Sequence, residues 1–241
     1  MSLDKPYQLV LLSHIGIFRL EKSMATLFAM EAQQGLDFPK PLTEEFKPAR
    51  IAEFVGLEKQ KKILASLAKN PRPCGLLFRG ATGTGKTSMA YALASELSAD
   101  VWHVGSQDCK VDRLKEISAR CWYVPSAGLR SFHVVIVDEA DKMSDAAQLY
   151  LLSKLDGTDP CPSTIWIFTC NGTEGLEKRF LDRCIPLPDF NSYGAVNEIA
   201  DLLARVWSIK APSATCPNFK KLASGSVRES LQRLESELLG V

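Results

Sequence analysis

The stretch "GATGTGKT", residues 80–87, constrains the fold more than any other part of the sequence. It follows the short apolar run "CGLLFRG" (74–80) and precedes "KTSMAYALASELS" (86–98), which has the composition of a helix. The pattern G-x-x-x-x-G-K-[ST] between a buried strand and a helix predicts a loop whose backbone N–H groups surround an anion. Glycines allow this turn without side-chain clashes, and the positive end of the helix then faces the anion. The chain is therefore expected to bind the phosphates of a nucleotide.

The positions of this loop have separate expected roles. Lys86 would reach the β- and γ-phosphates of a nucleoside triphosphate, and the Thr87 hydroxyl would bind Mg²⁺. The sequence therefore predicts ATP as the ligand and Mg²⁺ as the accompanying metal ion. The rest of the loop would surround the phosphates, at Gly80, Ala81, Thr82, Gly83, Thr84 and Gly85.

A second apolar run ends in a cluster of carboxylates. "FHVVIVD" (132–138) is followed directly by Glu139, and Asp141 lies two residues further on. In proteins with this phosphate loop a second strand ends in an aspartate that holds Mg²⁺, which predicts that role for Asp138. Glu139 is then placed to orient and polarise an attacking water, and Asp141 is expected to cap the turn. The cluster therefore predicts that the bound nucleotide is hydrolysed.

The letters "DEAD" at 138–141, together with "ATGTGKT", also occur in RNA helicases of the DEAD-box group. A helicase of that group needs two recombinase-like domains in one chain, and this sequence has room for one. It also lacks an S-A-T triplet shortly after the acidic strand, since the triplet at 213–215 comes more than 70 residues later, and it lacks an H-R-x-G-R run. These differences argue against a DEAD-box helicase.

Apolar segments of strand length alternate with helical segments through most of the chain. This alternation predicts a parallel sheet covered on both faces by helices. The expected strands are 74–80, 100–104, 132–138, 163–169 and 184–188. The expected helices between them are 57–70, 86–98, 111–122 and 144–156.

The sequence divides into three expected parts. Residues 1–36 form an N-terminal extension of unknown role, which is a peripheral helix or an upstream extension if translation begins at Met24. Residues 37–188 form an α/β nucleotide-binding domain, in which 42–56 is an extended lead-in with Pro48 in its middle. Apolar residues recur at helical spacing after Pro188, so 189–241 are expected to form a small all-helical lid domain.

Composition excludes few kinds of function. Of the 241 residues 46% are hydrophobic, which suits a globular protein, and the net charge of +1 neither favours nor excludes nucleic acid. Seven cysteines without a CxxC pair indicate reduced, mostly buried thiols in a cytoplasmic protein, with no zinc site. No apolar run is long enough to span a membrane. Asp4 and His14 argue against a signal peptide at the start.

Three further polar features follow the acidic strand in a definite order. The apolar run "TIWIFTCN" ends in Asn171, whose amide could bond the γ-phosphate or the attacking water. "EKRFLDRC" then supplies Arg179 and Arg183, and "GSVRESLQRL" has Arg228 near its start. Taken singly, such an asparagine is usually a turn former and such an arginine is usually solvated. Their order resembles that of AAA+ ATPases, which implies a five-stranded sheet in the order 5-1-4-3-2.

Within the AAA+ group the sequence resembles clamp-loader ATPase subunits of the replication factor C small-subunit type, found in cells and phages. The stretch "EEFKPARIAEFVGLEKQ" resembles the family's E-K-Y-R-P…D-x-x-G lead-in. "FHVVIVDEADKMSDAAQLYLLSKLD" resembles I-I-D-E-A-D-x-M-T…A-Q-x-A-L-x-R-x-x-E, and "FTCNGTEGLEKRFLDRC" resembles F-I-L-x-C-N…I-x-x-x-S-R-C. The resemblance covers about 42–235, which is most of the chain.

The resemblance implies further roles. Arg183 falls on the family's arginine finger, which reaches the γ-phosphate held by the neighbouring subunit. Arg228 falls on the lid sensor that touches phosphate. The lead-in residues Phe46, Pro48, Val55 and Gly56 would border the adenine.

The chain departs from the family pattern at three points. Asp182 replaces the small residue before the finger, and Lys154 replaces an arginine on the helix after the acidic strand. The sequence also stops soon after the lid, without the family's helical collar, which holds the ring together.

Three functions remain open at this point. The first is a clamp-loader-like ATPase, in a ring or spiral with itself or sibling subunits, that loads a sliding clamp on primer–template DNA. The second is an AAA+ ATPase without a collar that remodels or loads another partner, such as a helicase or transposition complex. The third is a subunit that binds ATP only to keep an assembly in shape. In the first case Arg113, Lys115 and Arg120 would lie near DNA phosphates, although a solvated helix face explains these charges equally well.

Overall fold

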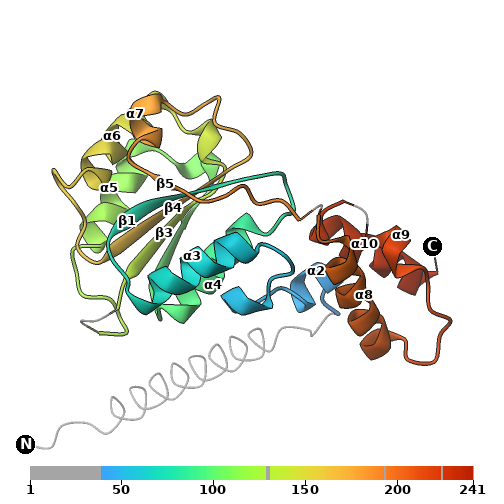
Figure 1. Ribbon diagram of the computed structural model, residues 1–241. Coiled ribbons are helices and arrows are strands. Elements are labelled where there is room, and N and C mark those ends of the chain that lie inside the picture. Colours follow the sequence, from blue (N-terminus) through green and yellow to red (C-terminus); the bar gives the residue numbers. More distant parts are fainter. Residues whose placement is uncertain (1–38, 129–130, 193, 224, 241) are drawn as a thin grey trace, which may run out of the picture. The chain divides into compact units, whose positions relative to one another are not determined.

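The fold is that of a computed structural model, which describes residues 39–128, 131–192, 194–223 and 225–240 (Figure 1). The chain divides into two units, Met1–Lys40 and Pro41–Val241, and the second contains every element described below. The expected N-terminal extension, 1–36, lies outside the described residues. Within the described ranges, no helix has both the length and the apolar character needed to cross a membrane.

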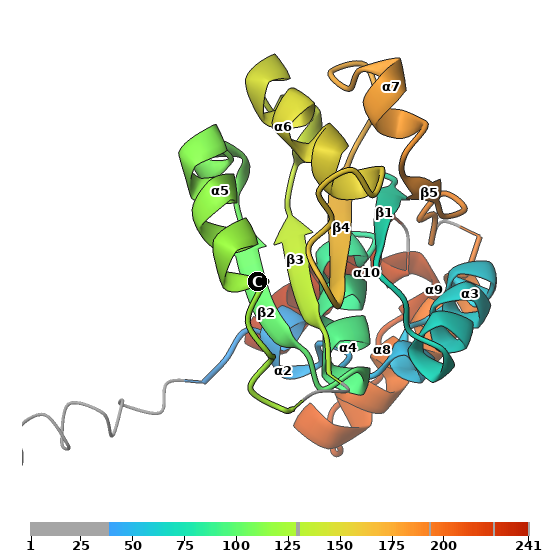
Figure 2. The same cartoon turned by 90° about the vertical axis from the view of Figure 1, so that its left-hand side faces the viewer.

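A parallel five-stranded sheet forms the centre of the second unit. Figure 2 shows its strands side by side in the order β2-β3-β4-β1-β5. This order confirms the expected 5-1-4-3-2 arrangement, counted from the opposite edge. The strand β5 is shorter than expected, because only two of the residues 184–188 pair with β1. The strands are β1 (Cys74–Arg79), β2 (Asp100–Val104), β3 (His133–Val137), β4 (Thr164–Cys170) and β5 (Ile185–Pro186).

Both faces of the sheet are covered by helices (Figure 1). Side chains alternate along each strand, so Val135 and Phe168 face one layer while Val134 and Ile167 face the other. One layer contains α5 (Val111–Arg120), α6 (Asp145–Leu155) and α7 (Lys178–Leu181). The other contains α3 (Glu58–Lys69), α4 (Lys86–Glu96) and the short η1 (Ile51–Glu53).

The strand order brings the functional segments to one edge of the sheet. The strands β1, β4 and β3 are neighbours, and Arg79 pairs with Cys170 while Val137 pairs with Phe168. Because all strands are parallel, the residues that follow β1, β3 and β4 emerge at the same edge. These are the phosphate loop, the acidic cluster and Asn171.

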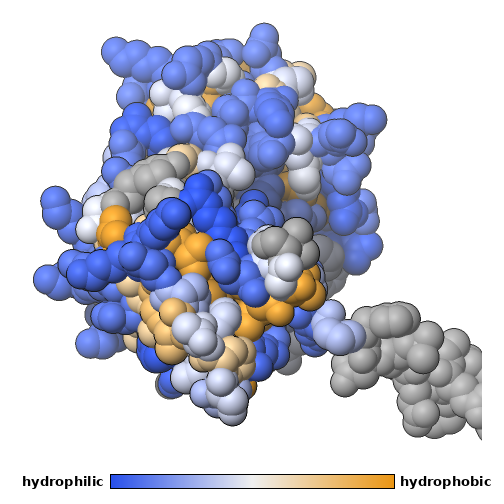
Figure 3. All heavy atoms as spheres, turned by 90° about the vertical axis from the view of Figure 1, so that its right-hand side faces the viewer, coloured by the Kyte–Doolittle hydropathy of each residue, from blue (hydrophilic) through white to orange (hydrophobic). Residues whose placement is uncertain are grey.

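A third hydrophobic cluster belongs to the helices near the C-terminus, α8 (Val196–Lys210), α9 (Phe219–Leu222) and α10 (Val227–Leu239). The short helix α2 (Leu42–Glu45) joins this cluster through Leu42, although it lies at the other end of the described chain. The backbone N–H of Leu42 donates to Glu235 Oε1 over 3.2 Å. Figure 3 shows the surface on the side of these helices, where hydrophobic residues lie among hydrophilic ones.

The expected extended lead-in is wrong in two places, because α2 and η1 interrupt it. Pro41, whose fixed φ suits a helix start, precedes α2, and the Pro41 carbonyl accepts the N–H groups of Glu44 and Glu45. Glu53 caps η1, because its carboxylate accepts the backbone N–H of Arg50 at the start of this short helix. Local hydrogen bonds of this kind compete with an extended chain and are not visible in apolar spacing.

The helix expected at 57–70 begins one residue later, since Leu57 has a left-handed conformation with φ 60°. Of the apolar residues that predicted it, Leu64 is fully buried whereas Ile63 is 41% exposed. On the same helix the polar residue Gln60 is buried, although Ile63 is not. Its side-chain amide donates to the carbonyls of Pro188 and Asp189, which satisfies the buried donor.

All seven cysteines lie in the described part of the chain, and none forms a disulfide. Five of them are buried, Cys74 is partly buried and Cys216 is exposed. Burial raises the pKa of the Cys170 thiol to about 11, so this residue is protonated at neutral pH.

Candidate nucleotide-binding site

The phosphate loop runs from the end of β1 to the start of α4. Two glycines in it are required by close contacts. A Cβ at Gly83 would lie 2.6 Å from Ser226 Oγ and 3.2 Å from Arg228 Cβ, and Gly83 also has a φ of +78°. A Cβ at Gly80 would lie 2.3 Å from the Phe190 carbonyl oxygen. The loop is thus confined between α10 and the segment that leads into α8.

The Lys86 side chain lies within the loop rather than in solvent. Its ammonium donates to the carbonyl oxygens of Gly80 (2.6 Å) and Ala81 (2.9 Å) and to Asn171 Oδ1 (3.0 Å). Burial lowers the pKa of this ammonium, while the charge of Asp138 acts in the opposite direction. Two residues expected to contact the γ-phosphate, Lys86 and Asn171, are therefore brought together at the end of the sheet.

The Asp138 carboxylate is held by three donors. Thr87 Oγ1 donates to Asp138 Oδ1 over 2.8 Å, and Thr169 Oγ1 donates to the same oxygen. His103 Nε2 lies 3.4 Å from Asp138 Oδ2. Burial opposes ionisation, but the hydrogen bonds from Thr169, Thr87 and His103 keep the pKa of the Asp138 carboxyl below its ordinary value. The group is therefore a carboxylate at neutral pH.

The Glu139 side chain faces solvent at the same edge and is 49% exposed. Its carboxylate accepts hydrogen bonds from Lys142 Nζ (2.5 Å) and Ser106 Oγ (3.3 Å). The hydrogen bond and charge of Lys142 lower the pKa of the Glu139 carboxyl. The Glu139 backbone is left-handed, with φ 52° and ψ 48°, and its N–H donates to Thr169 Oγ1 over 3.2 Å.

The expected capping role of Asp141 is wrong. The Asp141 Oδ1 atom is buried, and it has no hydrogen-bond partner in the part of the chain that the structure describes. The residue at the start of the turn is Glu139, and no side-chain hydrogen bond caps it. The turn closes instead through backbone bonds, in which the N–H of Lys142 donates to the Glu139 carbonyl.

The residues present fit a bound Mg²⁺ ion. The Thr87 hydroxyl and the Asp138 carboxylate are hard oxygen donors 2.8 Å apart, and both line the same cavity. Mg²⁺ is commonly held by one or two protein oxygens together with substrate phosphates. Thr87 and Asp138 are therefore the residues that would hold the ion.

Two adjoining cavities form the candidate site. The larger, about 660 Å³, is lined by the expected adenine neighbours Phe46, Pro48 and Val55 and by Leu202 and Leu231 of α8 and α10. The smaller, about 160 Å³, contains the polar groups of the phosphate end. The residues that line both are Gly83, Gly85, Ser88 and Arg228. Those that line only the smaller one include Thr82, Lys86, Thr87, Asp138, Glu139, Thr169 and Asn171.

Four residues that were expected to contact the nucleotide do not line the smaller cavity, and they make other contacts instead. Gly80 and Ala81 bind Lys86 through their carbonyls, and Thr84 donates its hydroxyl to the Ala81 carbonyl from the wall of the larger cavity. Gly56 lies outside the described lining of both cavities. Its N–H donates to Glu198 Oε2 of α8 over 2.7 Å, so it connects the lead-in to the helical part.

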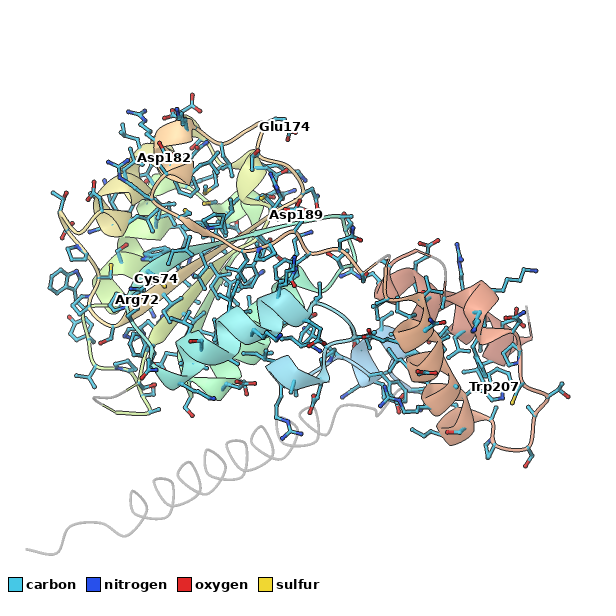
Figure 4. All side chains as sticks on the ribbon, in the orientation of Figure 1. Arg72, Cys74, Glu174, Asp182, Asp189 and Trp207 are labelled. Atoms are coloured by element: carbon cyan, nitrogen blue, oxygen red, sulfur yellow. The ribbon has the colours of Figure 1, made fainter. Side chains whose placement is uncertain are left out.

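Arg183 lies just after α7, outside the described lining of both cavities. Its Nε donates to Asp156 Oδ2 over 3.3 Å and its Nη1 to the Arg179 carbonyl over 2.7 Å. The preceding residue, Asp182, is exposed at the end of α7 (Figure 4). Lys154, the other departure from the family pattern, forms an ion pair with Asp159.

The three basic residues considered for DNA lie exposed on α5. Arg113 and Arg120 both pair with Glu116, at 2.6 Å and 2.9 Å. The Arg120 guanidinium also lies 5.2 Å from the centroid of the Trp102 ring. Intrahelical pairs of this kind are typical of a solvated helix face.

Sequence reasoning did not identify three residues that contact the acidic pair, namely Thr169, His103 and Ser106. Each lies at or just beyond the carboxyl end of a strand. One sequence signal could have indicated Thr169. It is a hydroxyl residue two positions before Asn171, near the end of the strand that follows the acidic one.

Comparisons with known proteins show which sequences this chain resembles. Residues 76–187 match the family described as "ATPase family associated with various cellular activities (AAA)". The replication factor C small subunit of Picrophilus torridus is 28% identical over 151 residues, covering 60% of this chain and 47% of that protein. Replication factor C small subunit 2 of Pyrobaculum islandicum is 34% identical over 207 residues, which cover 80% of this chain and 62% of that protein. The chain thus spans about half to three-fifths of the length of these relatives.

A solved structure supports the fold. The Holliday junction branch migration motor RuvB of Thermotoga maritima superposes with a TM-score of 0.64 at 20% identity, covering 79% of this chain and 64% of that one. The match of residues 76–187 to the AAA family, the strand order and the phosphate loop together support an AAA-type ATPase domain, and the chain is similar to replication factor C small subunits.

Proposed function

We propose that this chain binds and hydrolyses ATP as a clamp-loader-like subunit of a DNA replication assembly. The observation that carries the proposal is the pair of adjoining cavities, which share Gly83, Gly85 and Arg228. The larger cavity has apolar walls at Phe46, Val55 and Leu231 that suit an adenine ring, and the smaller one suits a triphosphate at a helix N-terminus. In this proposal the α/β part, expected over 37–188, and the helical lid, expected over 189–241, provide opposite walls.

Binding would begin with an exchange of contacts at Lys86. The ammonium releases the Gly80 and Ala81 carbonyls and donates to phosphate oxygens instead, which strengthens the interaction because a charged acceptor replaces neutral ones. Asn171, already 3.0 Å from Lys86, donates its amide to the γ-phosphate or the attacking water. Arg228 contacts phosphate from α10. When bound, Mg²⁺ supplies positive charge that neutralises the phosphates.

Hydrolysis requires a base for the attacking water. Glu139 is a carboxylate at neutral pH and is able to accept a proton, and the hydrogen bond and charge of Lys142 lower its pKa and so weaken it as a base while that contact lasts. In this structure Lys142 and Ser106 hold that carboxylate. Glu139 must leave Lys142 before it can orient the water, and a partner that favours this movement would accelerate turnover.

The arginine finger is proposed to act between subunits. Arg183 is held near the surface by Asp156 and the Arg179 carbonyl. From that position we propose that it reaches the γ-phosphate in a neighbouring subunit. An ATP-filled site would then favour assembly, and hydrolysis would weaken the contact.

The partner is proposed from the relatives named above, which are replication factor C small subunits. We propose a sliding clamp and primer–template DNA, with Arg113, Lys115 and Arg120 of α5 as candidate phosphate contacts. Turnover of the chain alone, with primed DNA, and with primed DNA plus a clamp tests this. Stimulation by both supports clamp loading, whereas stimulation only by another replication or transposition protein contradicts it.

Assembly is tested separately by native mass spectrometry with and without a slowly hydrolysed ATP analogue. Oligomers, alone or with sibling subunits, are expected to form when the analogue is bound. Monomers under every condition, including the presence of sibling subunits, would contradict a finger that acts between subunits.

Lys86→Ala is expected to weaken ATP binding roughly 10- to 100-fold, because each lost charge-assisted hydrogen bond contributes about 1.5–3 kcal/mol. Titration calorimetry with a slowly hydrolysed ATP analogue measures the loss. Lys69→Ala, at the end of α3, is the matched control and should bind as tightly as the wild type. Equal affinity of Lys86→Ala and wild type would show that nucleotide does not bind at this loop.

A further inference from the structure

Thr169 is a buried residue near the end of β4 whose hydroxyl contacts both members of the acidic pair. Its side chain lies at the phosphate end of the cavity, and the residue is only 2% exposed. Oγ1 donates to Asp138 Oδ1 and accepts the backbone N–H of Glu139 over 3.2 Å. A single side-chain atom thus connects the expected metal ligand with the expected base.

We propose that Thr169 is a positioning residue for ATP hydrolysis, holding the Asp138 carboxylate and the Glu139 backbone in their working arrangement. The inference rests on the proposed function of this site. Its donor and one acceptor position are both used by protein groups, so the hydroxyl acts through Asp138 and Glu139 rather than on the substrate.

The Glu139 backbone requires such support. With φ 52° and ψ 48° it occupies the left-handed region, which is unfavourable for a residue with a Cβ. The contact between the Glu139 N–H and Thr169 stabilises this conformation from the interior of the sheet. Removing the acceptor leaves that N–H without this hydrogen bond, so the turn can relax and displace the Glu139 carboxylate.

The Asp138 carboxylate depends on Thr169 in a different way. Oδ1 also accepts from Thr87, but Thr87 lies in α4 and is itself an expected metal ligand. Thr169 donates from the neighbouring strand and stays with the sheet. It can therefore fix the carboxylate orientation whether or not the site is filled.

The matched control lies on the same strand. Thr164, at the beginning of β4, is 1% exposed and donates its hydroxyl to the Pro162 carbonyl over 2.8 Å. It is a buried, hydrogen-bonded threonine far along the strand from the acidic residues. Thr164→Val therefore measures the general cost of removing a buried hydroxyl from β4.

The test compares Thr169→Val, Thr169→Ser and Thr164→Val with wild type. Thr169→Val is expected to lower kcat roughly 10- to 100-fold, as misplacement of a catalytic group does. Its affinity for ADP without Mg²⁺ should stay within about threefold of wild type, because no direct nucleotide contact is removed. Thr169→Ser keeps the hydroxyl and should restore kcat to within about threefold, and Thr164→Val should leave it unchanged.

A binding measurement keeps the test independent of turnover. Mg²⁺ should increase ADP affinity less in Thr169→Val than in wild type, because the Asp138 carboxylate is no longer held in place. In a Glu139→Gln background, Thr169→Val should reduce single-turnover hydrolysis by less than in the wild-type background, since both changes act on Glu139.

The outcomes separate this inference from the proposed function. Thr169→Val with wild-type kcat and a wild-type response to Mg²⁺ would overturn the inference and leave the ATPase proposal standing. Equal losses in Thr169→Val and Thr164→Val, or no rescue by Thr169→Ser, would also overturn it. A wild-type protein that neither binds nor hydrolyses ATP would overturn both.

Discussion

Substitution of Arg183 by alanine is expected to lower the turnover of assembled subunits roughly 10³- to 10⁵-fold, which is the usual contribution of an arginine finger. The guanidinium lies outside the described lining of its own subunit's two cavities, where Asp156 and the Arg179 carbonyl bind it. Its effect should therefore require a neighbour. ATP hydrolysis is measured at protein concentrations where native mass spectrometry detects oligomers.

Mixing two inactive variants tests whether the finger acts between subunits. A Lys86→Ala subunit cannot use its own site but can supply Arg183 to an Arg183→Ala neighbour, so a mixture should regain turnover that neither variant shows alone. Arg179→Ala is the matched control, because Arg179 is an exposed arginine on α7 that pairs with Glu177. No recovery in the mixture, with assembly intact, would mean that the finger does not act in trans.

Glu139→Gln is expected to reduce hydrolysis roughly 10²- to 10⁴-fold while ATP binding is retained. Glutamine has nearly the same size as glutamate but cannot accept the proton of the attacking water. Its backbone N–H can still donate to Thr169, so the turn should keep its left-handed conformation. Single-turnover kinetics give the rate, and calorimetry with ATP gives the affinity.

The control for that change is Asp145→Asn, which neutralises an exposed carboxylate of the same acidic stretch outside the described cavity lining. It should hydrolyse ATP like the wild type. If Glu139→Gln also hydrolysed at the wild-type rate, another group would have to activate the water. A loss of ATP binding in Glu139→Gln would instead indicate that the residue holds the nucleotide or its metal ion.

Much of the fold could be predicted because its signals are strong and local. Apolar runs of strand length alternate with helical segments, and the loop at 80–87 defines the junction of β1 and α4. The strand order came from the AAA+ resemblance, since spacing alone does not determine which strands pair. The lead-in could not be predicted, because Leu42 is buried by α8 and α10, more than 150 residues away in the sequence.

The residues of the candidate site differ in how visible they are in the sequence. Lys86, Thr87 and Asp138 occupy positions that known motifs specify, and the structure brings them to one cavity. Thr169 and His103 carry no motif, because their contacts arise from neighbouring strands whose register only the folded sheet defines. The misassignment of Asp141 has a related cause, since its backbone lies against Gly175, which follows β4 and is distant in the sequence.

The packing of α2 against the C-terminal helices has a consequence for the order in which the protein forms during synthesis. Leu42 and Glu235, whose hydrogen bond joins the two ends, are separated by 193 positions. Translation proceeds from the N-terminus, so α2 leaves the ribosome long before α10 exists. Until then Leu42 and Phe46 lack the α10 residues of the hydrophobic cluster to which they belong. The wall of the nucleotide cavity that contains Phe46 is therefore completed only when α10 has been made, and a nascent chain that stops before α10 should bind ATP more weakly than one that includes it.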